Sequence, residues 1–209
     1  MTERVFHTLR QTGRSEVEIK RSRFLGCAEP VTDESAFKHL LARVKADHPE
    51  ASHHAFAYRL GRDAGVARFS DDGEPGGTAG RPIMELMIRE DVVDAAVVVT
   101  RYFGGTLLGS CGRTRSYGQT ATEAVRSAGL ARMVPHTVVA ATVEYAHFGA
   151  IEQALLRAGI ELHETAFTDL VTITVRVPTG HEAELESLLA DVTAGAALVE
   201  RGATVYLAE

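Results

Sequence analysis

Residues 94–103, DAAVVVTRYF, hold the longest strongly apolar run of this 209-residue chain. The run AAVVV, at 95–99, fills the first half of the stretch, and a short continuous apolar run of this kind is typical of a buried strand. It is far too short to cross a bilayer, for which about 20 apolar residues are needed. We therefore expect a buried strand over 94–103 in a globular protein.

Periodic patterns before this strand predict further strands and a helix. The stretch VEIKRSRFLGCAEPV, 17–31, alternates unevenly and predicts one strand. HHAFAYRL at 53–60 and VARFS at 66–70, joined by the turn GRDAG, predict a β-hairpin. Between them, apolar residues spaced i, i+3, i+4 and i+7 indicate a helix that His48 and Pro49 end: Phe37, Leu40, Leu41 and Val44.

Two more helices are expected in this part of the chain. One begins near Pro82, because the first helical turn tolerates a residue without an N–H. After the strand at 94–103 we expect a loop over 104–112 and then a helix over 113–128, which Gly129 ends.

The composition changes near MVPH, 133–136, which we interpret as a short hinge. The patterns that follow predict the order β-α-β-β-α-β, which is the ferredoxin-like order. We therefore expect an α+β protein with two domains, at 1–132 and 136–209.

The two predicted domains differ in charge. Residues 1–132 carry 19 Lys and Arg against 17 Asp and Glu, whereas residues 133–209 carry 3 against 11, so the net charges are about +2 and −8. A polyanion would approach the first domain and be repelled by the second, whose acidity favours a protein partner. The chain as a whole does not have the composition of a basic nucleic-acid binder.

Cysteine use and the N-terminus predict a cytoplasmic location. Cys27 and Cys111 are too few for a disulfide framework and lack the partners of a structural zinc site, so we expect reduced thiols. The first residues are polar and of mixed charge, unlike a signal peptide, and no membrane partner is expected.

The stretch FSDDGEPGGTAGRPI, 69–83, carries the first candidate site. A glycine-rich loop that runs into a helix leaves backbone N–H groups that favour an anion. The spacing differs from a Walker A motif, and the alternative is a helix entry made of turn residues. The residues that would form this anion site are Gly76, Gly77, Thr78, Ala79 and Gly80, with Arg81 for charge.

Three acids in the same stretch oppose a simple phosphate site. Asp71, Asp72 and Glu74 would repel a bare phosphate, although they can hold Mg²⁺ together with ligand phosphates. Alternatively, they pair with nearby arginines or accept hydrogen bonds from neighbouring backbone. Magnesium is the one cofactor that the sequence allows us to consider.

The stretch RYFGGTLLGSCGRTRSYG, 101–118, carries the second candidate site. Arg101, Arg113 and Arg115 can bind phosphate, and Tyr102 and Phe103 can stack on a base. Because side chains alternate along a strand, the two rings should point apart, and one of them can instead belong to the core. His53 and His54 open a strand, so one should face inward. A histidine within reach of Asp71 or Asp72 could do acid–base work, but a hydrogen-bonded structural role is the commoner outcome.

Four segments together resemble the IMPACT family, and in particular its bacterial, YigZ-like branch. They are SRFLG at 22–26, AFAY at 55–58, the stretch at 69–83 and VVVTRYFGGTLLG at 97–109. The resemblance covers about residues 1–130. The rest resembles the small C-terminal domain of the bacterial branch, whose fold is similar to domain V of elongation factor G.

The resemblance implies a fold and a field of function. The first domain should resemble domain 2 of a ribosomal small-subunit protein, a fold also seen in GHMP kinases. Eukaryotic relatives bind a translation-associated effector and restrain a stress-response kinase, whereas for bacterial members the resemblance implies binding of nucleic acid or ribosomes. No catalytic residues are agreed for the family, so only a functional surface carries over: Arg101, Tyr102, Phe103, Gly104, Gly105, Leu108 and Gly109.

The sequence departs from the family at Ser110-Cys111-Gly112 and Arg113-Thr114. Cys111 stands where the family has a glycine, so a positive φ at this position is in doubt. The additional arginine makes the region more basic.

Our hypothesis from the sequence is a non-catalytic protein of translation that binds RNA or a ribosomal surface. The first rival is a metal-dependent phosphotransferase or hydrolase that uses the three acids. The second is a protein-interaction module that regulates a stress-response kinase pathway. The RNA surface would consist of the glycine loop, four arginines and an aromatic pair: Arg81, Arg101, Arg113, Arg115, Tyr102 and Phe103.

Overall fold

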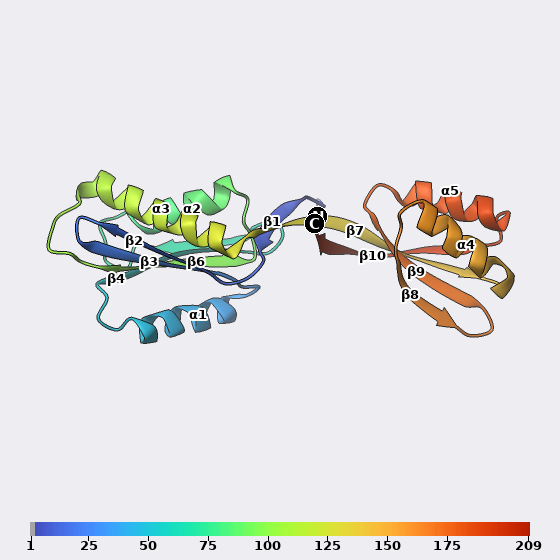
Figure 1. Cartoon of the computed structure of the whole chain (residues 1–209), viewed down its shortest axis with the longest axis horizontal. Coiled ribbons are helices and arrows are strands. Elements are labelled where there is room, and N and C mark those ends of the chain that lie inside the picture. The colour runs from blue at the N-terminus through green and yellow to red at the C-terminus, as the bar shows by residue number, and fades with distance from the viewer. Residues whose placement is uncertain (1–2) are drawn as a thin grey trace. The chain divides into compact units, whose positions relative to one another are not determined.

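The computed structural model describes residues 3–209, which form two compact units with a boundary between Arg132 and Met133 (Figure 1). Residues 3–5 group with the second unit, and the first unit begins at Phe6. The first two residues, where the predicted first domain starts, lie outside the described part. The mixed α+β class is confirmed.

The first unit is built on a five-stranded antiparallel sheet in the order β2-β3-β6-β4-β5. Its strands are β2 (Gly13–Ile19), β3 (Ser22–Pro30), β4 (His53–Leu60), β5 (Val66–Ser70) and β6 (Ala95–Tyr102). The predicted buried strand is therefore the centre of the sheet. Val97 and Val99 belong to the hydrophobic cluster on one face, and Ala96 and Val98 to the cluster on the other. Burial on both faces explains why this antiparallel strand is apolar without alternation.

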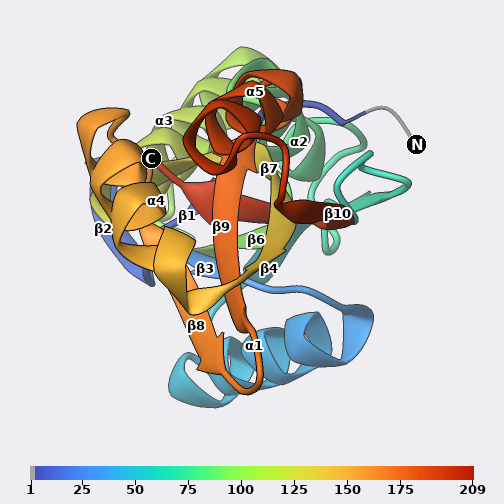
Figure 2. The same ribbon diagram turned by 90° about the vertical axis from the view of Figure 1, so that its right-hand side faces the viewer.

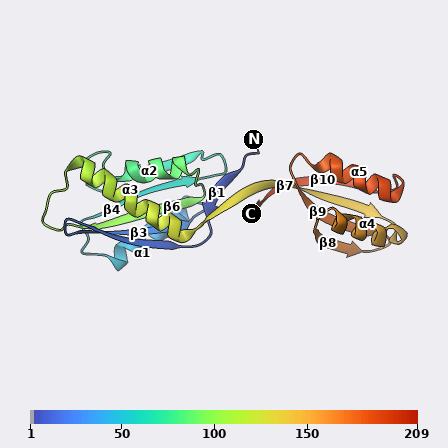
Figure 3. The same cartoon turned by 45° about the horizontal axis from the view of Figure 1, so that its top comes forward.

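Helices cover both faces of this sheet (Figures 1 and 3). α2 (Gly80–Arg89) and α3 (Gly109–Ala128) pack on one face, where Ile83, Met87 and Tyr117 are fully buried. α1 (Glu34–Asp47) packs on the other face through Phe37 and Leu40. The helix predicted from Phe37, Leu40, Leu41 and Val44 is thus present, and so is the hairpin of β4 and β5.

Two predictions of secondary structure are corrected. The stretch 17–31 forms two strands rather than one, because Lys20 and Arg21 adopt positive φ angles of 47° and 66° and turn the chain back. Helix α2 begins at Gly80, so Pro82 lies in its first turn as predicted, whereas α3 begins at Gly109 instead of 113, so part of the expected loop is helical. A short strand that the sequence did not reveal, β1 (Phe6–Leu9), precedes β2.

The second unit follows the predicted order β-α-β-β-α-β. Its elements are β7 (Leu130–Val143), α4 (Tyr145–Arg157), β8 (Leu162–Phe167), β9 (Val171–Pro178), α5 (Glu182–Thr193) and β10 (Leu198–Ala208). The strands pair antiparallel in the order β10-β7-β9-β8, which leaves β8 at an edge. Both helices cover one face of the sheet, and Ile151, Leu155, Leu185 and Leu189 fill the core beneath them (Figure 2).

The predicted hinge at 133–136 is not a loop. These residues lie within β7, which begins at the end of the first unit and continues into the second. Pro135 is accommodated there although proline normally interrupts a strand. In the described part of the chain, no helix is long and apolar enough to cross a membrane.

Candidate functional site

The two candidate stretches meet at one end of the first sheet. The register places His53, at the start of β4, opposite Arg101 near the end of β6. Arg23, at the start of β3, lies opposite Tyr102, and the end of β5 pairs with the first half of β4. Because α2 and α3 follow β5 and β6, both helices begin at this same end. We call it the loop end of the first unit, formed by residues 20–22, 71–81 and 102–115.

Asp71 occupies the backbone groups that the sequence offered to an anion. Its carboxylate accepts hydrogen bonds from the N–H groups of Gly77, Ala79 and Gly80 at 2.8, 2.9 and 2.8 Å. Burial acts to raise the pKa of Asp71, but these three donors and the nearby Arg81 hold the pKa below its ordinary value. The carboxylate of Asp71 therefore stabilises the N-terminus of α2. This agrees with the alternative prediction that the acids accept hydrogen bonds from neighbouring backbone.

Asp72 faces a different part of the loop end. It adopts a positive φ of 47°, and its carboxylate accepts a hydrogen bond of 2.6 Å from the backbone N–H of His54. Lys45, near the end of α1, lies 3.7 Å from the same carboxylate. Asp72 thus ties its loop to β4 and α1.

Glu74 is the centre of a buried polar cluster. Its side chain is only 3% exposed, and Arg101 Nη1 donates to its Oε1 at 2.5 Å. Tyr117 donates its hydroxyl to the same oxygen at 2.9 Å, and Arg113 Nε lies 3.6 Å from Oε2. Burial and the adjacent Glu74 carboxylate raise the pKa of Tyr117 far above its ordinary value, so the phenol remains a donor. His53 Nε2 lies 4.0 Å from Oε1.

This cluster gives a structural role to two arginines that the sequence predicts as phosphate ligands. The guanidinium groups of Arg101 and Arg113 are directed at Glu74, and the side chain of Arg101 is 5% exposed. Arg113 also donates to Thr78 Oγ1 at 3.3 Å. Both arginines therefore serve first as counter-charges inside the unit, which the arginine-pairing alternative for the acids predicts.

The donors of the predicted magnesium site do not gather. Asp71, Asp72 and Glu74 are each engaged by different partners, as described above. Among residues 3–209, no three His, Cys, Asp or Glu side chains lie together in an arrangement that would hold a metal ion. The acids of this loop therefore do not fit a magnesium ion in their present arrangement.

Gly104 allows the loop after β6 to lie against the β2–β3 turn. A Cβ atom at this position would lie 2.1 Å from the carbonyl carbon of Arg21, so only glycine fits. The hydroxyl of Ser22 accepts hydrogen bonds from Gly104 N at 3.2 Å and from Arg101 Nη2 at 3.3 Å. The loop is thereby attached to the polar cluster. Gly105 continues it with a φ of 77°.

The neighbouring rings of this loop have different surroundings. Tyr102 is half-buried, and its hydroxyl lies 3.0 Å from Nδ1 of His48 at the end of α1. Phe103 is 51% exposed, with the guanidinium of Arg101 over its ring at 5.5 Å. Leu107, farther along the loop, is also strongly exposed. Phe103 is therefore the ring of the predicted pair that a ligand can reach.

Helix α3 begins at the loop end without a side-chain cap. Leu108 is at the N-cap position, and among the described residues no side chain accepts a capping hydrogen bond from the first N–H groups of α3. The first turn also carries no acidic residue. Gly109 has a φ of 73°, whereas Cys111 lies within the helix with no positive φ, so the cysteine is compatible with the turn. Arg115, in the second turn, is exposed.

Four exposed cations belong to the loops and helix starts of this end: Lys20, Arg21, Arg81 and Arg115. Gly76 is also exposed. The two histidines at the start of β4 have structural partners, as expected. His53 Nδ1 lies 2.7 Å from the carbonyl of Asp72, and buried His54 contacts Thr100 Oγ1 at 3.1 Å.

Sequence reasoning missed two residues of the polar cluster, Ser22 and Tyr117. Tyr117 falls in the helix predicted over 113–128, where its apolar neighbours Ala121, Ala124 and Val125 recur at helical spacing. A tyrosine in a fully buried stripe needs a partner for its hydroxyl, and this signal was available in the sequence. Ser22 offered no comparable signal.

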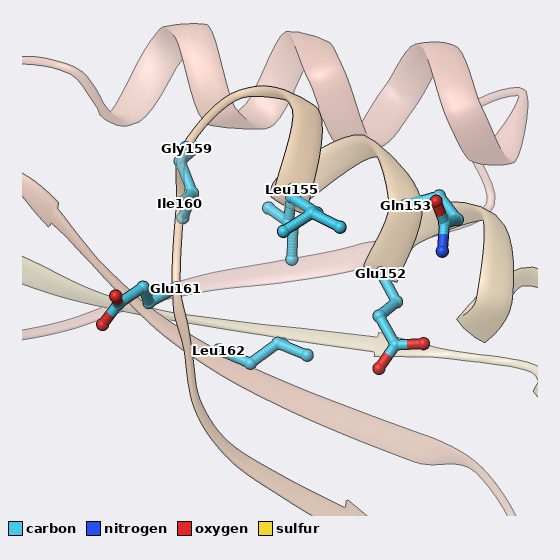
Figure 4. Close-up of a pocket in the computed structure, with 8 residues that line it drawn as sticks. Glu152, Gln153, Leu155, Gly159, Ile160, Glu161 and Leu162 are labelled. Carbon is cyan, nitrogen blue, oxygen red and sulfur yellow. The ribbon is translucent and has the colours of Figure 1, made fainter.

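A large hollow of the structure lies elsewhere, in the second unit (Figure 4). Its volume is about 560 Å³, and it lies beside the end of α4 and the start of β8. None of the site residues predicted from the sequence lines it. The lining residues are Glu152, Gln153, Leu155, Leu156, Gly159, Ile160, Glu161 and Leu162.

Comparisons with known proteins confirm the family that the four sequence segments indicate. Residues 20–125 match the model of the Impact N-terminal domain, and residues 142–196 match a domain of unknown function, DUF1949. The chain belongs to the IMPACT family. It is 34% identical to the IMPACT family member YigZ of Escherichia coli over 85% of this chain and 88% of that protein. It is 29% identical to the IMPACT family member YvyE of Bacillus subtilis over 97% and 93%, respectively.

The family likeness extends to a yeast protein and to a solved structure. The Protein IMPACT homolog of Saccharomyces cerevisiae is 33% identical over 56% of this chain and 46% of its own length. A crystal structure of a hypothetical protein matches with a TM-score of 0.61 and 31% identity, over 95% of this chain and 97% of that one. The bacterial relatives and the solved structure therefore share both parts of this chain, as the predicted YigZ-like branch requires.

Proposed function

We propose that this IMPACT family member is a non-catalytic RNA-binding protein that acts in or near translation. The loop end of the first unit would bind single-stranded RNA, including RNA exposed on a ribosomal surface. The exposed ring of Phe103 on a firmly attached loop is the observation that carries this proposal.

Phe103 has the properties of a stacking platform. Its ring is accessible, and its loop is held by the close approach of Gly104 to the β2–β3 turn. Stacking of a base on an aromatic side chain contributes about 1–3 kcal/mol and does not require a particular base. The guanidinium of Arg101 lies over this ring, 5.5 Å from its centre, and this cation–π contact helps to hold the ring in place.

The charges of the loop end favour phosphate more than the sequence suggests. The three acids are engaged internally by backbone N–H groups, Lys45 and buried arginines, so their negative charge is largely compensated. Exposed Lys20, Arg21, Arg81 and Arg115 remain for a ligand. The uncapped start of α3 adds the positive end of a helix dipole.

Resemblances at the level of domains support the translational setting. The family resemblance of the sequence implies that the first unit is similar to domain 2 of a ribosomal small-subunit protein and the second to domain V of elongation factor G. A fold does not specify a function, so this support is analogy. The rival phosphotransferase reading requires the acids to hold a metal, which their present contacts oppose.

A salt series with a single-stranded RNA oligonucleotide tests the proposal. We expect the affinity to fall as salt rises, and the Phe103→Ala and Arg115→Glu variants to bind more weakly. Loss of one phosphate contact should reduce the slope of log affinity against log salt by about 0.7. Arg101 and Arg113 are unsuitable for this test because their removal would leave Glu74 buried without its partners.

Lys38→Glu is the matched control, because it reverses an exposed cation on α1 away from the loop end. Equal weakening by Lys38→Glu and Arg115→Glu would indicate only a general charge effect and would contradict the proposed location. Absence of RNA binding at low salt would reject the function itself. A protein partner that remains bound after nuclease treatment would then favour the interaction-module alternative.

A further inference from the structure

An exposed aromatic cluster lies in the acidic second unit. The rings of Tyr145 and Phe167 are stacked, with centroids 6.2 Å apart and an angle of 26° between their planes. Phe148 meets Phe167 edge-on at 5.4 Å. Tyr145 and Phe148 belong to the first turns of α4, and Phe167 ends the edge strand β8. Two elements that are distant in sequence thus present their rings together.

The rings have unequal roles in packing. Phe148 is partly buried and packs against the hydrophobic core of this unit. Tyr145 and Phe167 are 54% and 58% exposed, and Leu170 beside them is also exposed. Core packing therefore accounts for Phe148 but leaves the exposed faces of the other two rings without a structural use.

The cluster is held in place before any partner binds. The hydroxyl of Tyr145 donates a hydrogen bond of 2.6 Å to the carbonyl of Thr168 in the β8–β9 turn. This turn is closed by a backbone hydrogen bond from Thr168 to Leu170. Binding to rings that are already ordered costs less conformational entropy than binding to mobile side chains.

Two exposed acids lie next to these rings in the sequence. Glu144 precedes Tyr145, Asp169 lies two residues after Phe167, and both are exposed. Residues 133–209 contain three Lys or Arg residues: Arg157, Arg176 and Arg201. Arg201 pairs with Glu186, and Arg176 contacts His163. Arg157 ends α4, which at 1.5 Å per residue is about 18 Å from Tyr145 along the helix.

We propose that this surface binds an arginine-bearing basic segment of a partner protein. The surface consists of Glu144, Tyr145, Phe167, Asp169 and Leu170 and is called the aromatic–acidic surface. A guanidinium group stacks favourably on an aromatic face and pairs with a carboxylate at its edge, so the arrangement matches arginine better than lysine. RNA could use the rings for stacking, but the acids and the charge of the unit would repel its phosphates. The inference does not rest on the RNA-binding function of the loop end.

Binding of a short labelled peptide of alternating arginine and glycine to the full chain tests this surface. We expect the Tyr145→Ala/Phe167→Ala double variant to bind the peptide about fivefold or more weakly. The Tyr145→Phe variant keeps the ring but loses the hydrogen bond to Thr168, so it should bind more weakly than the unaltered chain and more tightly than the double variant. A peptide with lysine in place of arginine should bind more weakly than the arginine peptide.

Matched controls separate this surface from general acidity. Glu144→Gln/Asp169→Asn keeps the rings and should weaken binding, whereas Glu152→Gln/Glu161→Gln removes two acids at the hollow of Figure 4 and should have little effect. Leu156→Ala removes an exposed apolar side chain from α4 outside the surface and should also have little effect.

Two results would overturn the inference. One is equal binding of the arginine peptide to the unaltered chain and to both surface variants. The other is a loss of single-stranded RNA binding, instead of arginine-peptide binding, in the Tyr145→Ala/Phe167→Ala variant. The Phe103→Ala variant tests RNA binding at the loop end and does not alter the aromatic–acidic surface. The two proposals can therefore fail separately.

Discussion

Replacement of Glu74 by glutamine should destabilise the first unit strongly. Glutamine keeps the size of the side chain but removes the charge that Arg101 and Arg113 share. Both guanidinium groups are largely excluded from water, so each would lose its counter-charge without gaining hydration. Removal of one partner from a buried ion pair typically costs about 3–5 kcal/mol. Since whole domains are stable by only about 5–15 kcal/mol, this loss is large.

Urea unfolding followed by circular dichroism measures this loss of stability. With a slope of about 2 kcal/mol/M, the midpoint should fall by about 2 M. Because the two units can unfold separately, hydrogen exchange of peptides from β6 and α3 should be measured as well, to assign the change to the first unit. Glu16→Gln provides the control, since Glu16 pairs with Arg23 at the surface, where such a pair contributes about 1 kcal/mol or less.

A change below about 1 kcal/mol for Glu74→Gln would refute this reasoning. It would mean that the buried guanidinium groups of Arg101 and Arg113 do not depend on the charge of Glu74. The double variant Glu74→Leu/Arg101→Met provides a second check. It should recover part of the stability lost in Glu74→Gln, because apolar side chains of similar volume often replace a buried ion pair without cost.

Three further predictions concern the same end of the first unit. Tyr117→Phe removes the hydroxyl donor to Glu74 and should cost about 1–3 kcal/mol in urea unfolding. Gly104→Ala should cost a similar amount, because its Cβ would overlap the backbone of Arg21; unchanged thermal unfolding would contradict the close approach. Asp71→Asn should lower stability near neutral pH by about 1 kcal/mol. Because the folded-state pKa of Asp71 is depressed, its contribution is present above the unfolded-state pKa and is lost as pH falls through the folded-state pKa, so the variant should lose less stability on acidification.

Local patterns in the sequence predict most of the elements and the class of the fold. The apolar run 95–99 indicates the central strand because burial on both faces removes polar side chains from it. The spacing of apolar residues likewise predicts α1 and the hairpin of β4 and β5. These signals are local, since hydrophobic periodicity depends on neighbours a few residues apart. The IMPACT family can also be identified from short segments, because its motifs are contiguous.

The ends of the elements and the turns between them could be predicted less well from these local patterns. The turn at Lys20 and Arg21 contains no glycine or proline, so its positive φ angles carry no local signal, and 17–31 was predicted as one strand. The glycines at 109 and 112 indicated a loop, although they lie in the first turn of α3. Packing of that helix on the sheet outweighed their weak helix propensity.

The sequence by itself determined the order of the elements in the second unit, the charge difference between the two units and the residue types that meet at the loop end. Only the tertiary structure decided what these residues do. Asp71 meets backbone groups up to nine residues away, whereas Glu74 meets Arg101 and Tyr117, which are 27 and 43 residues away. A charged side chain at the surface and one in a buried pair look the same in a sequence. Their difference lies in desolvation and in partners that folding alone brings within hydrogen-bonding distance.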